Sequence, residues 1–188
     1  MKFSTIPMYS FPELTDISAD FLDSIGVKFL MLDLDNTIAA YSEHQPSEKI
    51  SLWVETMKAH GLELFIISNS LRKKRIRKFA KILDVNVIMN AHKPSPKGAF
   101  QAMSSSGYSV KVSALVGDQI FTDVLAANRA GVISIIVKPR RFTNPVLALR
   151  YAIEYPFRAI CKNIFTSNPS RHSQECPSKA KTINRSKV

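Results

Sequence analysis

Seven side chains capable of polar chemistry stand at or just after the ends of short apolar runs in this sequence of 188 residues. They are Asp33, Asp35, Ser68, Lys93, Lys97, Asp118 and Asp123. Carboxylates at the end of a buried segment are costly unless a cation meets them. Four carboxylates, one hydroxyl and one ammonium, supplied by either lysine, suit a phosphoryl transfer that uses Mg²⁺, because this ion prefers hard oxygen ligands.

The first acidic pair, Asp33 and Asp35, would divide the steps of such a transfer between its two members. A carboxylate nucleophile attacks phosphorus and forms an aspartyl-phosphate, while a metal ion cancels the repulsion between the two anions. A carboxylate two residues further on can protonate the leaving oxygen and then activate water. A serine hydroxyl and a lysine would hold the other phosphoryl oxygens as charge shifts in the transition state.

The same residue types have other interpretations. A calcium loop beginning at Asp33 would need glycine at its sixth position and glutamate at its twelfth, where Ile38 and His44 stand, so we exclude it. An aspartate in a first helical turn, such as Asp123, also interacts favourably with the helix dipole. A lysine at the start of a helix, such as Lys97, is usually a solvated surface charge.

Five apolar runs rich in β-branched residues predict the strands that would position these side chains. They cover residues 27–32, 62–67, 85–89, 113–116 and 133–137. Helical patterns lie between them at about 47–60, 71–83, 97–106 and 122–130, with Gly61, Gly107 and Gly131 as C-terminal stops. This alternation predicts an α/β fold, a doubly wound, Rossmann-like parallel sheet with helices on both faces. The polar side chains would meet beyond the carboxyl ends of the strands, where such sheets bind ligands.

The composition is that of a folded and basic protein. Hydrophobic residues make up 45% of the chain, and the formal net charge is +11. Such a surface attracts polyanions such as nucleic acid, anionic lipid or a phosphorylated substrate. The two cysteines, Cys161 and Cys176, form no zinc or disulfide pattern. Without a signal peptide or an apolar stretch of about 18 residues, we expect a cytoplasmic protein, with peripheral contact at the inner membrane face left open.

The four polar segments resemble, in order and in position, the motifs of the haloacid dehalogenase-like (HAD) superfamily of phosphatases. They are "DLDNT" (33–37), "ISN" (67–69), "KP" (93–94) and "GDQIFTD" (117–123), within a resemblance that spans about residues 17–139. The opening "SFPELTDISADFLDSIGVKFLMLDLDNT", the "SNS" and the "GDQIFTDVLAANRAGV" are similar to the bacterial YqeG-type phosphatases of subfamily IIIA. These are related to the phosphatidylglycerophosphate phosphatases of mitochondria and plastids, and the resemblance implies a HAD-like fold.

The resemblance also implies a role for each residue. Asp33 would be the nucleophile and a metal ligand, and Asp35 the general acid and base, with its backbone carbonyl also on Mg²⁺. Ser68 would bind the phosphoryl group, Lys93 would neutralise the intermediate, and Asp118 would ligate Mg²⁺. Asp123 would support the metal shell or orient Lys93. The substrate-binding residues would be Asn36 and Thr37, which shape the loop, and Asn69 and Gln119, which lie near the substrate. Spacing alone leaves open whether Lys93 or Lys97 is the catalytic lysine.

We expect four segments along the chain. They are an N-terminal extension that packs on the core (1–26), the HAD-like core (27–141), an amphipathic basic segment (142–165) and a disordered tail rich in Ser, Lys and Pro (166–188). The short intervals between the four polar segments leave room for helices but not for an inserted cap domain. Members of the superfamily without a cap generally handle substrates too large to enclose, or borrow a lid from a partner.

Two basic stretches each carry two interpretations. In "LRKKRIRKFAK" (71–81), the apolar stripe of a helix would hold Ile76, Phe79 and Ala80, so the bases, Arg75 among them, would face water. They would form either a solvated face or an anion-binding surface, and nucleic acid is less favoured because no aromatic residues are interleaved. Segment 142–165 would either rest in a lipid interface or pack on its own domain.

The leading hypothesis is a Mg²⁺-dependent phosphomonoester hydrolase that acts through an aspartyl-phosphate, with phosphatidylglycerophosphate as the substrate that the resemblance implies. A phosphatase for a soluble, protein or nucleic-acid-end phosphate is the second hypothesis. A receiver domain or a non-catalytic phosphate- or nucleic-acid-binding module is the third. A receiver would carry its phosphorylated aspartate after the third strand, where "NAHKPSP" stands instead. The sequence leaves the oligomeric state open.

Overall fold

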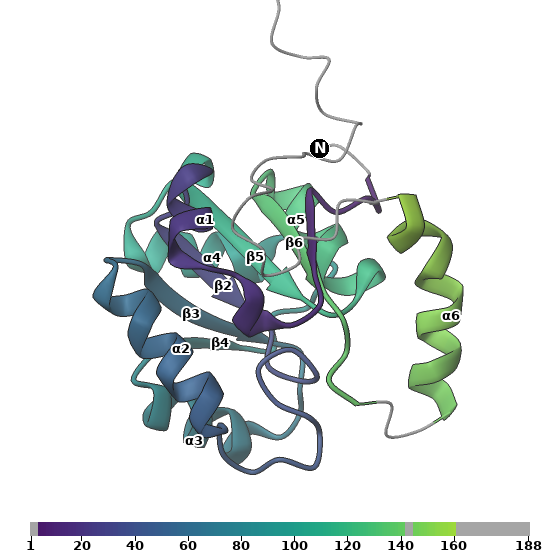
Figure 1. Ribbon diagram of the computed structural model, residues 1–188, viewed down its shortest axis with the longest axis horizontal. Coiled ribbons are helices and arrows are strands. Elements are labelled where there is room, and N and C mark those ends of the chain that lie inside the picture. Colours follow the sequence, from purple (N-terminus) through teal and green to yellow (C-terminus); the bar gives the residue numbers. More distant parts are fainter. Residues whose placement is uncertain (1–3, 142–144, 161–188) are drawn as a thin grey trace, which may run out of the picture.

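Six short parallel strands form the central sheet of the computed structural model, which describes residues 4–141 and 145–160 (Figure 1). The strands are β1 (Tyr9–Phe11), β2 (Phe29–Leu32), β3 (Glu63–Ser68), β4 (Asn86–Met89), β5 (Ser113–Gly117) and β6 (Ile133–Val137). Their order across the sheet is β1-β6-β5-β2-β3-β4, and every neighbouring pair is parallel. The parallel α/β sheet predicted from the alternating runs is therefore confirmed.

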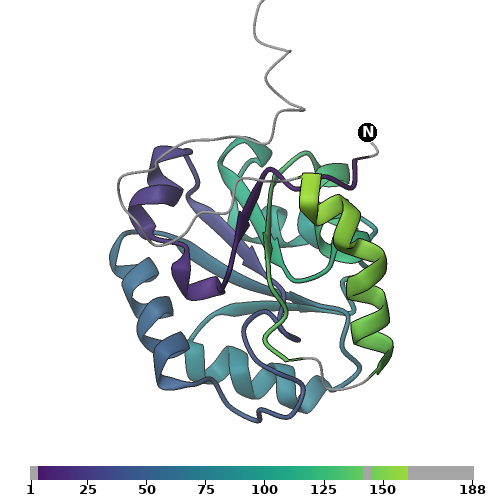
Figure 2. The same cartoon turned by 45° about the vertical axis from the view of Figure 1, so that its right-hand side comes forward.

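Helices cover both faces of the sheet (Figures 1 and 2). One hydrophobic cluster joins the sheet to α1 (Ala19–Ser24), α2 (Glu48–Ala59) and α3 (Lys73–Leu83). A second cluster joins the opposite face to α4 (Lys97–Ser106) and α5 (Leu125–Ala130). The remaining elements are the 3₁₀ helices η1 (Leu14–Asp16) and η2 (Val110–Val112), the π-helical turn η3 (Ile120–Val124) and the last helix, α6 (Pro145–Ile160). The doubly wound arrangement follows from these two covered faces.

Strand β2 shows why its run of apolar residues is continuous rather than alternating. Leu30 and Leu32 belong to the cluster under α1, α2 and α3, whereas Phe29 and Met31 belong to the cluster under α4 and α5. Because successive side chains of a strand point to opposite faces, a strand covered on both sides needs apolar residues at every position. All four residues of β2 are buried accordingly.

The strand β1 and the helix α1 were not among the predicted elements. Tyr9 to Phe11 pair with Ile135 to Val137 at one edge of the sheet. The rings of Tyr9 and Phe11 stand edge-on to Phe21 of α1, with centroids 5.1 and 5.0 Å apart respectively. Three residues between Pro7 and Pro12 are too short a run to predict a strand, and here tertiary packing decides the conformation.

The chain reverses its direction across the sheet at β2. From β2 it proceeds outward through β3 and β4, then returns to β5 on the other side of β2 and continues to β6. In sheets of this kind ligands bind beyond the carboxyl ends of the strands, at the point where the order reverses. Residues 33–47, between β2 and α2, contain no regular element beyond an isolated bridge, so the described residues include no cap domain over this edge.

The helix boundaries differ from the predicted ones by one or two residues for α2 and α3. The helix predicted over 122–130 is instead the π-helical turn η3 followed by α5. The glycine stops are confirmed, since Gly107 and Gly131 follow α4 and α5 with φ values of 72° and 78°. No helix among the described residues is long and apolar enough to cross a membrane. Cys161, Cys176 and the predicted disordered tail lie outside the described residues.

Candidate active site

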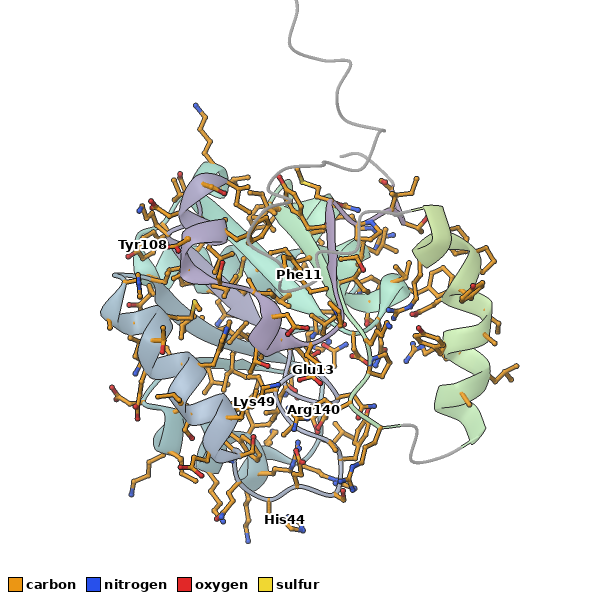
Figure 3. All side chains as sticks on the ribbon, viewed as in Figure 1. Phe11, Glu13, His44, Lys49, Tyr108 and Arg140 are labelled. Atoms are coloured by element: carbon orange, nitrogen blue, oxygen red, sulfur yellow. The ribbon has the colours of Figure 1, made fainter. Side chains whose placement is uncertain are left out.

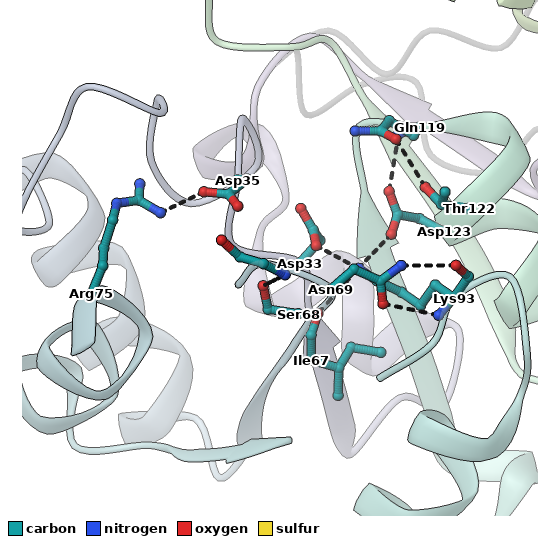
Figure 4. A network of polar contacts seen from close by, with 11 residues as sticks. Asp33, Asp35, Ile67, Ser68, Asn69, Arg75, Lys93, Gln119, Thr122 and Asp123 are labelled. Carbon is teal, nitrogen blue, oxygen red and sulfur yellow. Dashed lines mark hydrogen bonds and ion pairs between the residues drawn. The ribbon is translucent and has the colours of Figure 1, made fainter. Parts of the chain in front are cut away.

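Lys93 lies at the centre of a buried group of charges beyond the carboxyl ends of β2, β3 and β5 (Figure 4). Its Nζ forms an ion pair with Asp33 and a second one, 2.6 Å long, with Asp123. It also donates a hydrogen bond to the Ile67 carbonyl, with a length of 3.1 Å. Burial lowers the pKa of Lys93, but the two carboxylates outweigh that effect and hold the pKa above its usual value. The lysine is therefore a fixed positive charge beside Asp33.

The position of Lys93 is fixed by its backbone rather than by its side chain alone. Asn69, directly after β3, donates to the Lys93 carbonyl at 2.8 Å and accepts from the Lys93 amide at 2.9 Å. This two-bond clasp joins the loop after β3 to the loop after β4. Lys97 is exposed in the first turn of α4. Of the two lysines that the spacing left open, the structure brings Lys93 to Asp33.

Three carboxylates gather around this lysine. Asp33, Asp118 and Asp123 each offer one oxygen atom within 4.8 Å of the others, and all three side chains are buried. Burial raises the pKa of Asp33 to about 7, against the opposing charge of Lys93 and with a further contribution from the charge of Asp123. Burial, with the charges of Asp123 and Asp33, also raises the pKa of Asp118 well above its usual value. One lysine does not compensate three buried carboxylates.

These carboxylates fit a divalent cation with hard-ligand preference. The Oδ1 atom of Asp118 is buried and has no hydrogen-bond partner, which is costly unless a cation meets it. Asp123, to which the resemblance gave only a supporting role, is a member of this group together with Asp33 and Asp118, two of the three predicted metal ligands. The carboxylate of Asp35 lies outside the group. Its predicted contribution was its backbone carbonyl.

Asp35 forms an ion pair with Arg75 of α3 (Figure 4). Arg75 also donates to the carbonyls of Glu43 and Ala40, each at 2.8 Å, and its guanidinium carbon lies 4.9 Å from the centroid of the Phe79 ring. The expectation that Arg75 faces water was wrong. The loop after β2 passes over the first turns of α3, and its carbonyls together with Asp35 satisfy the guanidinium donors in a buried position.

The remaining predicted residues divide into two groups. Ser68 is buried at the end of β3, where its hydroxyl accepts from the Ser70 amide at 3.1 Å. Gln119 donates its backbone N–H to Asp123 at 3.1 Å, and its side chain accepts from Thr122 at 3.1 Å. Ser68, Asn69 and Gln119 line the site cavity.

Asn36 and Thr37, in contrast, are buried outside the lining of that cavity. Their side-chain polar atoms have no hydrogen-bond partner among the described residues. Asn36 has a φ of 64°, a left-handed conformation that asparagine tolerates better than most residues. These two residues therefore shape the turn after the acidic pair.

The cavity above these residues has a volume of about 650 Å³. Beyond the predicted site residues, the cavity is lined by residues to which the sequence analysis gave no role in the site: Tyr41, Ser70, Leu71, Arg72, Pro94, Phe121, Thr122 and Arg150. Burial and the nearby carboxylates raise the pKa of the Tyr41 hydroxyl to about 12, so it stays protonated. Arg72, directly before α3, and Arg150 of α6 place positive charge at the cavity from two separate parts of the chain.

Helix α6 contacts the loop that carries Asp118. Glu154 accepts a 3.4 Å hydrogen bond from the Phe121 amide, and Arg158 donates to the Asp118 carbonyl and, at 3.2 Å, to the Val137 carbonyl. Arg158 and Glu154 form an ion pair of 3.0 Å. The ring of Phe157 packs edge-on against Phe121 at 5.5 Å. The described part of segment 142–165 therefore packs on its own domain.

Comparison with known proteins agrees with this geometry. A family model described as mitochondrial PGP phosphatase matches residues 2–140, which include every predicted site residue. The chain belongs to this family. The family assignment confirms the predicted HAD superfamily and shows that the protein is a phosphatase. The match ends before α6, so Arg150 and the contacts of Glu154 and Arg158 lie outside the matched residues.

A curated relative supports membership of the PGP phosphatase family. "Probable phosphatase YqeG" of Bacillus subtilis (strain 168) is 32% identical over 123 residues, which are 65% of this chain and 71% of the relative. Among solved structures, an uncharacterised protein from Listeria monocytogenes serotype 4b has a TM-score of 0.52 and 16% identity, covering 63% of this chain and 85% of that one. The likeness to the Listeria structure concerns the fold alone.

Proposed function

We propose that this phosphatase hydrolyses phosphatidylglycerophosphate through an aspartyl-phosphate on Asp33, with Mg²⁺ held by the neighbouring carboxylates. The observation that carries the proposal is the buried ion pair of Asp33 and Lys93 at the base of an open cavity, next to the unpartnered oxygen of Asp118. A nucleophile, a fixed cation and spare anionic ligands at one point are the parts that phosphoryl transfer requires.

The metal would be held by Asp33 and Asp118, with the Asp35 backbone carbonyl and Asp123 beside them. When bound, Mg²⁺ supplies positive charge that lets an anionic carboxylate approach an anionic phosphate. Asp123 also accepts from the Gln119 amide, so it is held in place independently of the metal. Its second oxygen pairs with Lys93, which connects the cation-binding group to the lysine.

Asp33 would attack phosphorus while the ester P–O bond breaks and Asp35 gives a proton to the leaving oxygen. Arg75 holds Oδ1 of Asp35, so Asp35 would begin the cycle with this proton on Oδ2. In the second step Asp35 takes a proton from water, the water oxygen bonds to phosphorus, and the bond from phosphorus to Asp33 breaks. Inorganic phosphate leaves, and both aspartates return to their starting states.

Lys93 and Ser68 would stabilise the phosphoryl oxygens during both steps. Lys93 is buried and held by two carboxylates and a carbonyl, so it needs little rearrangement as charge develops. The Ser68 hydroxyl accepts from the Ser70 amide, and its own proton remains to be donated to a phosphoryl oxygen.

The lipid substrate is supported by the family and by the shape of the site. The described residues include no cap domain, so a phosphate carried by a large molecule has access to the cavity. Arg72 and Arg150 at the cavity suit a substrate with a second negative charge near the phosphomonoester, and phosphatidylglycerophosphate carries a phosphodiester in that position.

Phosphate release tests the proposal directly. We would compare phosphatidylglycerophosphate in mixed micelles with a soluble alkyl phosphate, with and without Mg²⁺, for the native chain and for Asp33→Asn. We expect Mg²⁺-dependent hydrolysis of the lipid that the substitution lowers by at least about 10³-fold. Hydrolysis of the soluble ester alone would keep the mechanism and reject the lipid. Activity that survives in Asp33→Asn would reject the mechanism.

A further inference from the structure

A hollow of about 710 Å³ lies beside the proposed active site, at the start of α3. It is lined by Arg75 and by a set of exposed residues that we call the α3 surface: His44, Leu71, Arg72, Lys73, Lys74 and Lys78. Figure 3 shows His44 pointing outward from the loop after β2, at the same edge of the molecule as α3 in Figure 1. Four residues of this surface carry full positive charge, and none of the residues lining the hollow is acidic.

The α3 surface has an apolar centre as well as charge. Leu71 is 87% exposed, the highest value among the large hydrophobic side chains that the structure describes as exposed. It is not needed for the core, because α3 packs through a separate stripe of Ile76, Phe79, Ala80 and Leu83. Lysine and arginine side chains around a leucine extend their apolar stems beside it and their charges beyond it. This combination differs from a solvated charged face, which needs no exposed leucine.

The α3 surface is continuous with the active site. Leu71 and Arg72 line both the hollow and the cavity that contains Asp33. Arg72 is held at this boundary by a 2.9 Å hydrogen bond from Nη1 to the Tyr41 carbonyl. A partner that rests on the α3 surface therefore contacts two residues that also line the cavity.

We propose that the α3 surface binds an anionic lipid bilayer, with Leu71 entering the interface and the cations contacting the headgroups. The proposal rests on the proposed function, which places a phosphate monoester of a lipid at the cavity. A bilayer interface has anionic headgroups outside and acyl chains within. The cations of the α3 surface match the headgroups, and the exposed Leu71 matches the acyl chains. Single-stranded nucleic acid matches them less well, since the lining contains no Trp, Tyr or Phe on which a base would stack.

Sedimentation of the full chain with vesicles tests the surface in the absence of any substrate. The vesicles would contain phosphatidylcholine alone or with an equal part of phosphatidylglycerol, at about 0.1 M NaCl. Lys74→Glu/Lys78→Glu reverses two charges of the α3 surface. Lys81→Glu/Lys111→Glu reverses two exposed charges outside it, so the two variants have the same net charge. Circular dichroism would verify that each variant is folded.

We expect the native chain to bind only the anionic vesicles, and Lys74→Glu/Lys78→Glu to bind them at least about 10-fold more weakly, with a change below about 3-fold in the control. Leu71→Asp should weaken binding more than Leu52→Asp, which changes another exposed leucine. Equal losses in the two charge variants would overturn the proposal in favour of net charge. Vesicle binding retained in Lys74→Glu/Lys78→Glu, with binding of a single-stranded oligonucleotide lost, would overturn it in favour of nucleic acid.

Failure of this proposal is distinguishable from failure of the proposed function. Lys74 and Lys78 lie outside the lining of the cavity, so their substitution should leave hydrolysis of a soluble aryl phosphate unchanged. If the lipid is not the substrate, vesicle binding through the α3 surface still occurs and phosphate release from the lipid does not. If the α3 surface does not bind lipid, soluble hydrolysis persists and the matched variants sediment alike.

Discussion

At the scale of single residues, the site is under electrostatic strain that a cation would relieve. Asp33 and Asp123 share one buried lysine, and Asp118 beside them has an oxygen without a partner. Like charges held together in a buried position raise the free energy of the folded state. Without a metal ion, the native protein should therefore be less stable than a variant in which one of these carboxylates is replaced by a neutral group.

Asp118→Asn should accordingly stabilise the protein while abolishing its activity. Without metal, removing one buried charge is expected to raise the free energy of unfolding by at least about 1.4 kcal/mol, the equivalent of one pKa unit. Mg²⁺ should raise the melting temperature of the native chain but not that of the variant. Calorimetry with EDTA and with Mg²⁺ measures both effects. Asp20→Asn, at an exposed position, is the control, and a metal-free variant less stable than the native chain would contradict the expectation.

The raised pKa of Asp33 predicts a dependence of stability on pH. Because its pKa is about 7 in the folded state and near 3.8 when unfolded, the folded state retains a proton that the unfolded state loses between these values. The contribution of Asp33 to stability is therefore full below about pH 4 and decreases as pH rises through about 7, by at most about 1.4 kcal/mol per pH unit.

Urea unfolding without metal, from about pH 4 to 8, would measure this dependence in the native chain and in Asp33→Asn. Groups distant from the site titrate alike in both proteins, so the difference in unfolding free energy between them reports on Asp33 together with the carboxylates beside it. We expect the native chain to lose stability relative to the variant as pH rises. A difference in unfolding free energy that stays constant from about pH 4 to 8 would contradict a raised pKa for Asp33.

Arg75 should act as a positioning residue for proton transfer by Asp35. Arg75→Met removes the guanidinium that holds Asp35 and the loop after β2 to α3, and we expect kcat to fall about 10- to 100-fold for an alkyl phosphate. An aryl phosphate, whose leaving group needs little protonation, should lose less. Arg77→Met, at an exposed position of the same helix, is the control. Equal losses for both substrates would indicate a general structural defect instead.

The identities of the charged residues could be predicted from the sequence, but their pairings could not. Spacing after the apolar runs located Asp33 and Asp118 at one edge of the sheet, and it left Lys93 and Lys97 as alternatives for the lysine. Arg75 lies one position from the apolar stripe of α3, and only the path of a distant loop decides that it turns inward. The clasp of Asn69 and Lys93 likewise joins two loops that are 24 residues apart, a contact that local patterns do not encode.

At the scale of elements, the continuous apolar runs predicted five of the six strands because burial on both faces leaves a strong signal. The strand β1 has three residues and takes its order from β6, so its own sequence carries little signal. The sequence predicts a helix over 122–130, but the π-helical turn η3 takes the first part of this range. This wider turn places the Asp123 carboxylate where it accepts a hydrogen bond from the Gln119 amide. The periodicity of apolar residues does not predict such a turn.

Gly117 at the end of β5 allows Asp123 to approach the site. A Cβ atom at this position would lie 2.2 Å from Cγ of Asp123, which forces the carboxylate or the strand to move. We expect Gly117→Ala to lower the free energy of unfolding by about 2 to 3 kcal/mol and to abolish the stabilisation by Mg²⁺. Gly26→Ala, where a Cβ meets open space, should cost about 1 kcal/mol and keep the response to Mg²⁺. Thermal unfolding with and without Mg²⁺ distinguishes the two variants. If Mg²⁺ still stabilised Gly117→Ala, the proposed role of Gly117 in admitting Asp123 to the site would be contradicted.

At the scale of the whole molecule, an open site and a basic surface lie on neighbouring parts of one edge. The formal net charge is +11, and the α3 surface concentrates part of it beside the cavity. Net charge alone would raise the concentration of any polyanion near the protein. A localised surface beside the site should instead couple binding of the lipid interface to turnover, because bound chains already have the cavity near the headgroups.

This coupling predicts different salt dependences for two substrates. Interactions of exposed charges are screened over about 10 Å at 0.1 M salt and about 3 Å at 1 M. Raising NaCl between these values should therefore increase the apparent KM for phosphatidylglycerophosphate in anionic vesicles by about 10-fold or more, since several cations lose their attraction at once. For a soluble aryl phosphate, which meets only the cavity, KM should change less. In Lys74→Glu/Lys78→Glu the difference between the substrates should shrink, because the surface no longer attracts the headgroups. A salt response equal for both substrates in the native chain would place the effect in the active site rather than on the α3 surface.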